Sequence, residues 1–514
     1  IMIYLADSRE VITISGLGTW PKAASCAYFQ DKHGGAIPKG VERAVVPAAP
    51  DAWITALERY GTMRFGDVAA AAIRFARDGF PMYPLMAHII AEAEGAYRTW
   101  PSNAEIFLPE GRPPEPGEIF VQADLARSLQ YMADEEAANG DDGREAGLKA
   151  ARDAFYRGDI AATMVKFFEE SGGLMTAEDL ADFRVAIEPP VRSRFGAIDV
   201  YACGPWCQGP MLPQILNLLE GMDLRRLGHN SPAYIHAVVE AVKLGAADRE
   251  AYYGDPRFVD VPIDVLLSKD YAERRRGSIR ADRAAEGMPE PGDVGRGTEA
   301  RPSARTAVAG AVAASDTEGA LDTSYVCVVD SHGNAFSATP SDGTRTSPVV
   351  PGTGLCPSSR GAQSWTDPDP PSSIAPGKRP RLTPNPAIAI EDGRMVMPFG
   401  TPGGDVQVQA MAQVFLNMFV FGMDPQSAVE APRFASYGFP SSFEPHAYSP
   451  GRLCIESSIG AAHGEALTAL GHQVEWWEER SWKACSVCAI RADTKSGVLH
   501  AAAAVRRMAY ALGW

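Results

Sequence analysis

Residues 321–339 read LDTSYVCVVDSHGNAFSAT and predict a β-hairpin. A strand rich in β-branched and aromatic residues leads into a polar turn with Gly333 and Asn334, and a second short strand returns. The stretch before it, from about Arg276 to Ala320, is poor in bulky apolar residues and rich in Ala, Gly, Pro, Ser and charge. This composition indicates a flexible segment that delivers the chain to Thr323 at the first position of a buried strand.

Thr323 at this junction suits a peptide bond that is cut. A threonine hydroxyl is a weak nucleophile and needs a base beside it. If the bond between Asp322 and Thr323 is cut, the new α-amine, with a reference pKa of roughly 7.7–8.0, supplies that base on the same residue. On the pattern alone an ordinary strand threonine after a loop is the commoner interpretation, so the choice depends on the rest of the chain.

The composition of the chain is that of a globular enzyme. Its 514 residues are 46% apolar and 22% charged, and the net charge of −16 comes without any Lys/Arg-rich run. The acidic balance argues against a nucleic-acid partner. No apolar stretch approaches the roughly 20 residues that a membrane helix needs, so no membrane partner is expected. The first residues lack a start methionine and a signal-like pattern, from which we expect a missing N-terminal part; a cytoplasmic or periplasmic location stays open.

The eight cysteines and nine histidines show no metal-ligand spacing. Cys485 and Cys488 form a Cys-x-x-Cys pair, but no second Cys/His pair accompanies them, and their setting is typical of a buried strand. We interpret the cysteines as structural and reduced. Neither a metal nor another cofactor is expected.

Apolar periodicity and capping residues predict helices on both sides of a group of strands. Strands are predicted at 1–6, 11–15, 191–202, 387–390, 394–398, 489–491 and 498–501. Helices are predicted at 51–58, 65–77, 209–219, 231–253 and 406–419. Strands packed under helices on both sides indicate a layered architecture.

Gly403 and Gly404, just before a predicted helix, form a second chemical element. Two unhindered N–H groups at the positive end of a helix can bind phosphate or stabilise the oxyanion of a tetrahedral intermediate. A phosphate loop would continue with a Lys-Ser/Thr pair, whereas this chain continues with Asp405 and Val406. An oxyanion site therefore remains, with a purely structural turn as the alternative.

With these pieces in place, the chain resembles the γ-glutamyltranspeptidase family of N-terminal-nucleophile hydrolases over most of its length. Residues 323–335 resemble the family's T-T-H-Y-S-V-V-D-x-x-G-N-A, and GTPGG at 400–404 resembles its G-S-P-G-G oxyanion loop. Further similar stretches are PGKRP at 376–380, FGMD at 421–424, AVEAPRF at 428–434, and residues 234–256 against its long helix and G-D-P turn.

The resemblance implies an α+β fold, a four-layer αββα sandwich, made as a precursor that is cut between Asp322 and Thr323. The large segment would be residues 1–322, ending in a flexible linker at about 276–322, and the small catalytic segment would be residues 323–514. Both segments would build one sandwich domain and stay associated as a heterodimer. Pairing of two such heterodimers is left open.

The resemblance also implies the roles of four residues. Thr323 would be the nucleophile, first on the Asp322 carbonyl and then on the amide carbonyl of a small-molecule substrate. The N–H groups of Gly403 and Gly404 would hold the oxyanion, and an acyl-enzyme would pass its acyl group to water or to an amine. Ser341 stands where the family has a hydroxyl residue near the nucleophile, and an ordinary loop serine is the alternative there.

The family's γ-glutamyl pocket does not carry over to this chain. The arginine that grips the α-carboxylate of the substrate aligns with Leu17, and the two serines that bind the same carboxylate align with Leu382 and Thr383. An asparagine downstream of the nucleophile becomes Gly343, and the N-N-Q-M-D-D run becomes residues 358–363. Replacing an arginine by a leucine removes a bidentate carboxylate clamp, so a γ-glutamyl group should bind poorly.

Arg345 and Arg360 are cations that the family pattern does not have at these positions. Either could hold a carboxylate that is placed differently, as in a small α-oxo amide acid, with Gln363 and Thr383 as further substrate-binding positions. A solvated surface arginine is the alternative at each. The pattern is nearer the oxamate amidohydrolase-like and acylase-like branches of the family than its glutathione-degrading members.

Three functions are consistent with the sequence. The first is an N-terminal-threonine amidohydrolase that acts on a small non-glutamyl, carboxylate-bearing amide. The second is a γ-glutamyl hydrolase or transpeptidase for glutathione-like substrates whose pocket uses other residues. The third is an unprocessed, catalytically silent binding homologue, which the intact Thr323, Gly403 and Gly404 disfavour.

Overall fold

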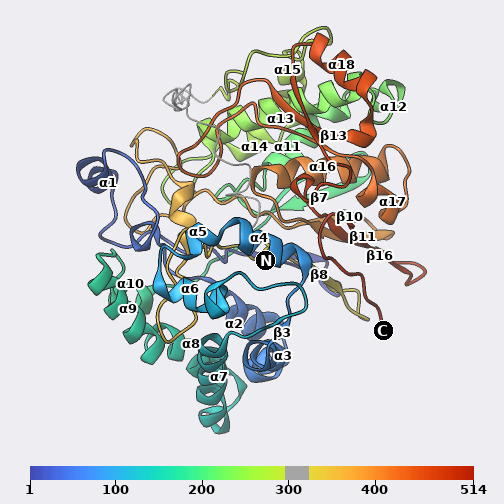
Figure 1. The fold of residues 1–514 in the computed structure, drawn as a ribbon. Coiled ribbons are helices and arrows are strands. Elements are labelled where there is room, and N and C mark those ends of the chain that lie inside the picture. Colours follow the sequence, from blue (N-terminus) through green and yellow to red (C-terminus); the bar gives the residue numbers. More distant parts are fainter. Residues whose placement is uncertain (296–322) are drawn as a thin grey trace.

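The computed structural model describes residues 1–295 and 323–514, in which two β-sheets lie face to face between helices (Figure 1). The five-stranded sheet has the order β5-β2-β1-β9-β8, and the six-stranded sheet has the order β16-β15-β11-β10-β7-β6. Neighbouring strands in both sheets are antiparallel. The predicted α+β fold, a four-layer αββα sandwich, is confirmed.

Each large sheet combines strands from before and after the undescribed residues 296–322. The five-stranded sheet contains β1 (Met2–Leu5), β2 (Glu10–Ile14), β5 (Ile187–Glu188), β8 (Val326–Val329) and β9 (Ala335–Ala338). The six-stranded sheet contains β6 (Val191–Phe195), β7 (Ile198–Ala202), β10 (Ala387–Glu391), β11 (Met395–Gly400), β15 (Cys488–Asp493) and β16 (Leu499–Ala503). Pairing of β1 with β9, and of β7 with β10, therefore ties residues before 296 to residues after 322.

Alternation along the strands decides which side chains fill which layer. Ile388 in β10 and Val396 in β11 point toward the other sheet, where they meet Met2 and Tyr4 of β1. Their neighbours in sequence, such as Met397, point the opposite way into the larger core beneath the helices. Successive side chains of a strand point to opposite faces, so these strands, buried on both sides, are apolar almost throughout.

The two helical layers cover the outer faces of the sheets (Figure 1). On the six-stranded sheet lie α11 (Met211–Glu220), α16 (Gln407–Phe419) and α17 (Pro425–Glu430), with α13 (Pro232–Tyr252) packed on α11. On the other side lie α2 (Ala49–Tyr60), α3 (Phe65–Asp78), α7 (Ala123–Ala138), α8 (Arg144–Tyr156) and α9 (Asp159–Ser171). Ala52 of α2 contacts Ile3 and Ile14 of the five-stranded sheet, which anchors this second layer.

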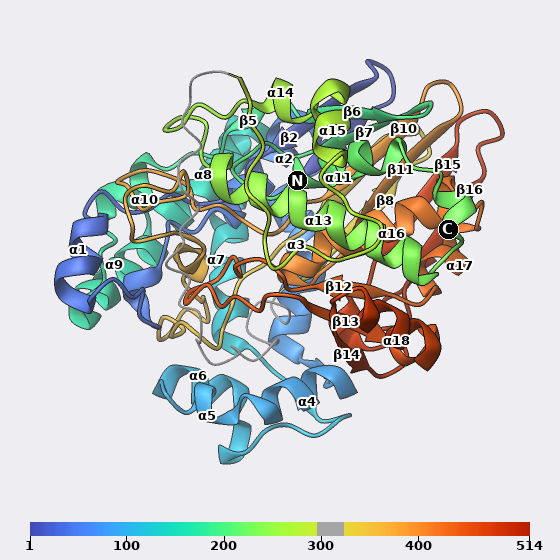
Figure 2. The same cartoon turned by 90° about the horizontal axis from the view of Figure 1, so that it is seen from above.

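The remaining elements lie at the edges of the sandwich. Figure 2 shows a small three-stranded sheet with α18 grouped at one edge, and α4, α5 and α6 gathered at another. The strands of the three-stranded sheet are β12 (Phe434–Ser436), β13 (Arg452–Glu456) and β14 (Gln473–Trp477). A separate short pair is formed by β3 (Phe80–Pro81) and β4 (Ile119–Phe120). The other helices are α1 (Cys26–His33), α4 (Pro84–Glu92), α5 (Glu94–Tyr97), α6 (Pro101–Phe107), α10 (Ala177–Asp182), α12 (Leu224–Leu227), α14 (Ile263–Leu266), α15 (Lys269–Arg276) and α18 (Ala461–Ala469). Within the described ranges, none of the helices is long and apolar enough to cross a bilayer.

Two strand predictions differ from the structure. The predicted strand at 191–202 is a hairpin, because Gly196 adopts a φ of 57° and turns β6 back into β7. The predicted buried strand after Thr323 is the edge strand β8, in which Val326 and Val328 are 45% and 46% exposed. Thr323 itself is buried, and it precedes β8 rather than starting it.

The long helix α13 is buried all round instead of along one apolar face. It begins as predicted, because the Ser231 hydroxyl accepts a hydrogen bond from the Tyr234 N–H at 3.1 Å and Pro232 occupies the first turn. The charged residues Lys243, Asp248 and Arg249 are nevertheless fully enclosed. Buried charges need partners, so this helix carries ion pairs into the interior.

The linker expected at about 276–322 falls partly on described residues. Residues 277–295 run over the molecule and are held there, since Gly292 donates its N–H to Asp248 at 2.8 Å and accepts from the Tyr252 hydroxyl at 2.6 Å. The rest of the predicted linker, with Asp322, lies outside the described residues. The division of the chain at 322/323 therefore stays a prediction.

Candidate active site

Thr323 faces Ser341 across an isolated antiparallel bridge beyond the end of the β8–β9 hairpin. The two hydroxyl oxygens lie 2.7 Å apart. The guanidinium of Arg360 donates to the Ser341 hydroxyl at 2.8 Å and to the Ser341 carbonyl at 3.2 Å. The structure therefore brings together Thr323, Ser341 and Arg360, three residues that lie apart in the sequence.

This arrangement favours negative charge on the Thr323 oxygen. Because the Ser341 oxygen accepts from Arg360, the Ser341 hydroxyl can donate its own proton to Thr323. A cation behind such a donor stabilises an oxyanion that develops in front of it. Neither Ser341 nor Arg360 is a base, so the proton of Thr323 has to leave to another group, such as the α-amine of a cut chain.

Asp342 holds the Ser341 turn in place. Its Oδ1 accepts from the N–H and the hydroxyl of Ser359 at 2.8 and 2.9 Å, and from the N–H of Gly343 at 2.8 Å. Ser359 begins the short 3-10 turn that carries Arg360. The carboxylate thus fixes the two loops that present Ser341 and Arg360.

Gly403 and Gly404 form a turn that is separated from the end of β11 by two residues, and at Gly403 only glycine fits. Their φ values of 135° and 56° lie in the left-handed region, and a Cβ on Gly403 would stand 2.2 Å from the Cys485 sulfur. The ring of Tyr325 packs on Gly400, the last residue of β11, where an added Cβ would meet it at 2.3 Å. The end of β11 therefore joins the segment that carries Thr323 to the glycine turn.

The N–H of Gly404 already has a partner in the structure. Hydrogen-bonding partners orient the Gln407 amide so that its nitrogen donates to the Thr401 carbonyl at 3.1 Å and its oxygen accepts from the Gly404 N–H at 3.2 Å. An oxyanion at Gly404 would have to share or replace that acceptor. The predicted oxyanion site at Gly403 and Gly404 stays a prediction, although the turn itself is present, with positive φ at both glycines.

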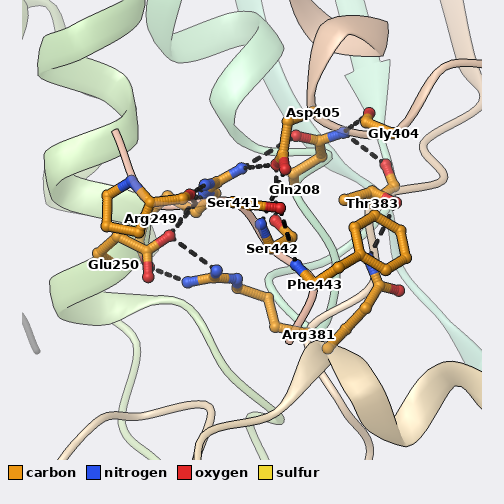
Figure 3. A network of polar contacts seen from close by, with 12 residues as sticks. Gln208, Arg249, Glu250, Arg381, Thr383, Gly404, Asp405, Ser441, Ser442 and Phe443 are labelled. Carbon is orange, nitrogen blue, oxygen red and sulfur yellow. Dashed lines mark hydrogen bonds and ion pairs between the residues drawn. The ribbon is translucent and has the colours of Figure 1, made fainter. Parts of the chain in front are cut away.

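A buried ion network anchors the glycine turn to α13 (Figure 3). Asp405 pairs with Arg249 of α13 at 2.5 Å, and it accepts from the N–H and the hydroxyl of Ser442 at 2.8 and 2.6 Å. Gln208 bridges the turn to its neighbour, because its amide donates to the carbonyls of Thr383 at 2.7 Å and Gly404 at 3.0 Å. Although burial acts to raise the pKa of Asp405, the Arg249 cation and the bonds from Ser442 hold that pKa below its usual range.

The network continues through a second carboxylate. Glu250 pairs with Arg249 at 2.9 Å and with Arg381 at 2.7 Å, and all three side chains are enclosed (Figure 3). Burial acts to raise the pKa of Glu250, but Arg381 and Arg249 hold that pKa below its usual range. Two arginines and two carboxylates thus compensate one another behind the glycine turn.

The predicted substrate-binding residues differ in their position relative to the cavity next to Ser341. The Gln363 amide donates to the Thr383 hydroxyl at 3.0 Å, and both residues are buried behind Leu382 and Pro384. Arg345 is half-buried and, among the described residues, does not line the cavity next to Ser341, whereas Arg360 does. The structure therefore gathers Arg360 with Ser341 at the cavity, whereas Arg345 is not among the described lining residues; their roles in binding stay predictions.

A cavity of about 490 Å³ opens beside the Thr323 hydroxyl contact. Ser324, Ser341 and Arg360 line its polar end, and Leu17 and Leu382 line it as well. Helices α2, α7, α8 and α9 supply a further part of the wall, and loop residues within 339–342 and 350–358 supply another. Sequence reasoning missed the helical wall, because apolar residues spaced along α7 are equally typical of ordinary core packing.

His236 and Glu240, one turn apart on α13, meet His472, so that possible ligand atoms of the three lie within 4.8 Å of one another. The carboxylate of Glu240 already accepts from Lys243 at 2.7 Å and from the Ala285 N–H at 3.1 Å. Burial, with the Lys243 cation nearby, lowers the pKa of His472 to about 3. The four-residue spacing of His236 and Glu240 was a signal for this cluster, but the lysine occupies the place beside the carboxylate that a cation would need.

Comparisons with known proteins show what this chain is similar to. The family model of gamma-glutamyltranspeptidase matches residues 1–514. The acylase ACY 1 proenzyme of Pseudomonas sp. (strain SE83) is 31% identical over 92% of this chain and 78% of its own length. The glutathione hydrolase proenzyme of Pseudomonas sp. (strain A14) is 30% identical over 89% of this chain and 77% of its own. The crystal structure of cephalosporin acylase from Bacillus halodurans is similar with a TM-score of 0.81 at 25% identity, covering 98% of this chain and 84% of that one.

Replacing Gly400 with alanine should disturb the Thr323 segment, because the new Cβ would overlap the Tyr325 ring. Cleavage before Thr323 would give two fragments, and we expect Gly400→Ala to slow their appearance. A shift of Tyr325 by about an ångström should lower the rate at least about tenfold. Gly95→Ala is the matched control, since nothing lies within 4 Å of its new Cβ. Equal cleavage rates of the Gly400→Ala protein and the wild type, followed on denaturing gels, would contradict this contact.

Removing the charge of Asp405 should destabilise the chain, because Arg249 would stay buried without its partner. We expect Asp405→Asn to cost about 3 kcal/mol at pH 7 in urea unfolding. Since the folded-state pKa of Asp405 is lowered, its contribution is complete above roughly pH 4 and is lost as the pH falls further, so the difference from wild type should shrink at pH 3.

Asp392→Asn is the control for this charge removal. Asp392 pairs with Arg9 at 3.3 Å, and its side chain is 85% exposed, so its loss should change stability by less than about 1 kcal/mol. The ion-pair account is wrong if the two variants unfold alike at pH 7.

Proposed function

The chain belongs to the γ-glutamyltranspeptidase family, and on that premise we propose that it is a self-processing amidohydrolase with Thr323 as its N-terminal nucleophile. The observation that carries the proposal is the short contact of Thr323 with Ser341, backed by Arg360. The positive-φ glycine turn supports it, because this turn follows β11, whose last residue packs on Tyr325. A nucleophilic oxygen, a donor with a cation behind it and an oxyanion turn are the parts that acyl transfer needs.

The proposed processing step uses the same groups on the chain itself. The Thr323 oxygen attacks the carbonyl of the preceding residue, the peptide C–N bond breaks as an ester forms, and the hydroxyl proton passes to the released nitrogen of Thr323. Water then opens the ester, which leaves a carboxylate on Asp322 and a free α-amine and hydroxyl on Thr323. The amine is the base that neither Ser341 nor Arg360 can be.

The proposed turnover repeats this chemistry on a substrate. The Thr323 amine takes the hydroxyl proton, the oxygen attacks the amide carbonyl, and the N–H groups of Gly403 and Gly404 receive the oxyanion. The amine product leaves with the proton, and water hydrolyses the acyl-enzyme. For this step the substrate oxygen has to share or replace the Gln407 oxygen at the Gly404 N–H.

The two products of the cut would stay together. Strand β9 pairs with β1, and β10 pairs with β7, so both sheets contain strands from each side of Thr323. Relatives described as proenzymes fit a large and a small segment that form a heterodimer. Separation of the segments would require unfolding of both sheets.

We further propose that the substrate is a non-glutamyl amide. Leu17 and Leu382 line the cavity beside Ser341, so apolar side chains occupy the wall where a γ-glutamyl carboxylate would need hydrogen-bond donors. A second candidate is a small carboxylate-bearing amide, because Arg360 also reaches the cavity. Its Nε and Nη2 already donate to Ser341, which leaves only part of the guanidinium for a substrate.

Replacing Thr323 with alanine should abolish both steps. We expect intact mass spectrometry to show the wild type as two polypeptides, residues 1–322 and 323–514, and Thr323→Ala as one uncut chain. Amide hydrolysis should fall at least roughly a thousandfold in the variant. Thr323→Ser is the matched control, because it keeps the hydroxyl and should still be cut. A wild type that is fully active but uncut would refute the proposal.

The pH dependence of the cut enzyme should report the α-amine as the base. We expect kcat/KM for an amide to rise with pH and level off, with a midpoint at or somewhat below roughly 7.7–8.0, since a nearby guanidinium disfavours the ammonium form. The protein is assayed between pH 5 and 9.5 at saturating and limiting substrate. A midpoint near 4 would indicate a carboxylate base and contradict this assignment.

A further inference from the structure

The cavity beside Ser341 has an apolar part, which we call its body, and a polar end next to Ser341, which we call its mouth. Its body is lined by Trp53 of α2, Leu125, Leu129 and Met132 of α7, Phe155 of α8 and Met164 of α9. Its mouth is lined by Ser324, Ser341, Asp342 and Arg360. At about 490 Å³ it has the size of a small-molecule site rather than of a packing defect.

Several polar groups of the wall are already engaged with the protein, whereas the Thr339 hydroxyl is buried there without a hydrogen-bond partner among the described residues. Ser341 is bonded to Thr323 and Arg360, and Asp342 accepts from Ser359 and Gly343. Ser128, deeper in the wall, donates to the Thr353 carbonyl at 2.7 Å. A charged group that entered the body of the cavity would lose its water, and the neutral Thr339 hydroxyl alone would not compensate its charge.

The charges at the mouth also compensate each other. Among the described lining residues the charged side chains are Arg360 and Asp342, whose nearest atoms lie 3.8 Å apart. In the described part of the chain, no other charged residue lines the cavity. An uncharged group is therefore the favoured occupant of the body.

The cavity is placed for the acyl side of a substrate. Ser341 is both a wall residue and the contact of the Thr323 oxygen at 2.7 Å, so a carbonyl attacked by Thr323 lies at the mouth. Leu17 and Leu382 stand in the wall where the γ-glutamyl group is gripped in the pattern that the sequence resembles. The group attached to that carbonyl then extends into the apolar body.

We propose that this cavity binds an uncharged, apolar acyl group, which makes the protein a deacylase of amides with a medium-length alkanoyl or arylacetyl group. This inference rests on the proposed function of Thr323. In the step it requires, the Thr323 oxygen forms an ester with the acyl carbon, the C–N bond breaks, and the amine leaves with the hydroxyl proton. Water then releases the apolar carboxylic acid and restores the hydroxyl.

A panel of p-nitroanilides with one leaving group and different acyl groups tests this inference. For the wild type we expect kcat/KM for the hexanoyl and phenylacetyl anilides to exceed that for the glutaryl and γ-glutamyl anilides by at least about 100-fold, because a buried unpaired charge is costly. Faster turnover of the glutaryl or the γ-glutamyl anilide overturns the inference while leaving the proposed chemistry intact.

A charge placed in the wall sharpens the test. Leu129→Lys, in the wall of the cavity, should lower kcat/KM for the hexanoyl anilide at least about 50-fold and raise that for the glutaryl anilide, whose carboxylate gains a partner. Gln130→Lys puts the same charge on the next residue of α7, which is exposed, and should leave both values unchanged. Equal effects of the two variants overturn the inference.

A binding measurement separates failure of the pocket from failure of the chemistry. Trp53 lines the cavity and is 43% exposed, so phenylacetate bound there should change the tryptophan fluorescence of the wild type and of Gln130→Lys, but not that of Leu129→Lys. If no anilide is cleaved and this pattern is seen, the proposed function fails and the apolar pocket stands. If phenylacetate and hexanoate leave the fluorescence of the wild type unchanged, the pocket inference fails.

Discussion

The contact between two hydroxyls, that of the buried Thr323 and that of the half-buried Ser341, is the constraint on which the site depends. Their oxygens lie 2.7 Å apart, and the arginine behind Ser341 makes that serine a donor toward Thr323. A hydroxyl that receives such a bond is prepared to carry negative charge but still lacks a base. The missing base explains why cleavage before Thr323 is central to the proposal: it creates an amine on the same residue.

The sandwich supplies the rigidity that this contact needs. Both sheets mix strands from the two sides of Thr323, and Tyr325 packs on the end of β11, from which the glycine turn emerges. The turn is tied to α13 by Asp405 and Arg249, which are buried with their neighbours. Residues that are far apart in sequence are therefore fixed by packing and by compensated charge, two interactions that survive a cut in one loop.

The sequence predicted the parts of the site that have a local signature. Thr323 and the Gly403–Gly404 turn are recognisable from neighbouring residues, and the strands and the layered fold follow from periodicity and resemblance. Arg249, by contrast, meets Asp405 across 156 residues, and burial of α13 on all sides cannot be read from one amphipathic stripe. The exposed edge strand β8 and the cavity wall on α7 were missed for the same reason, because both depend on what packs beside an element and not on its own residues.

The central claim is that the acyl group of a substrate becomes attached to the Thr323 oxygen. It is tested most directly by quenching the enzyme with acid during turnover of phenylacetyl p-nitroanilide and measuring the masses of its polypeptides. The account predicts a small segment that begins at Thr323 and carries one phenylacetyl group, which peptide mapping places on that residue. An adduct on another residue, or turnover by a chain still intact at the bond before Thr323, would contradict it.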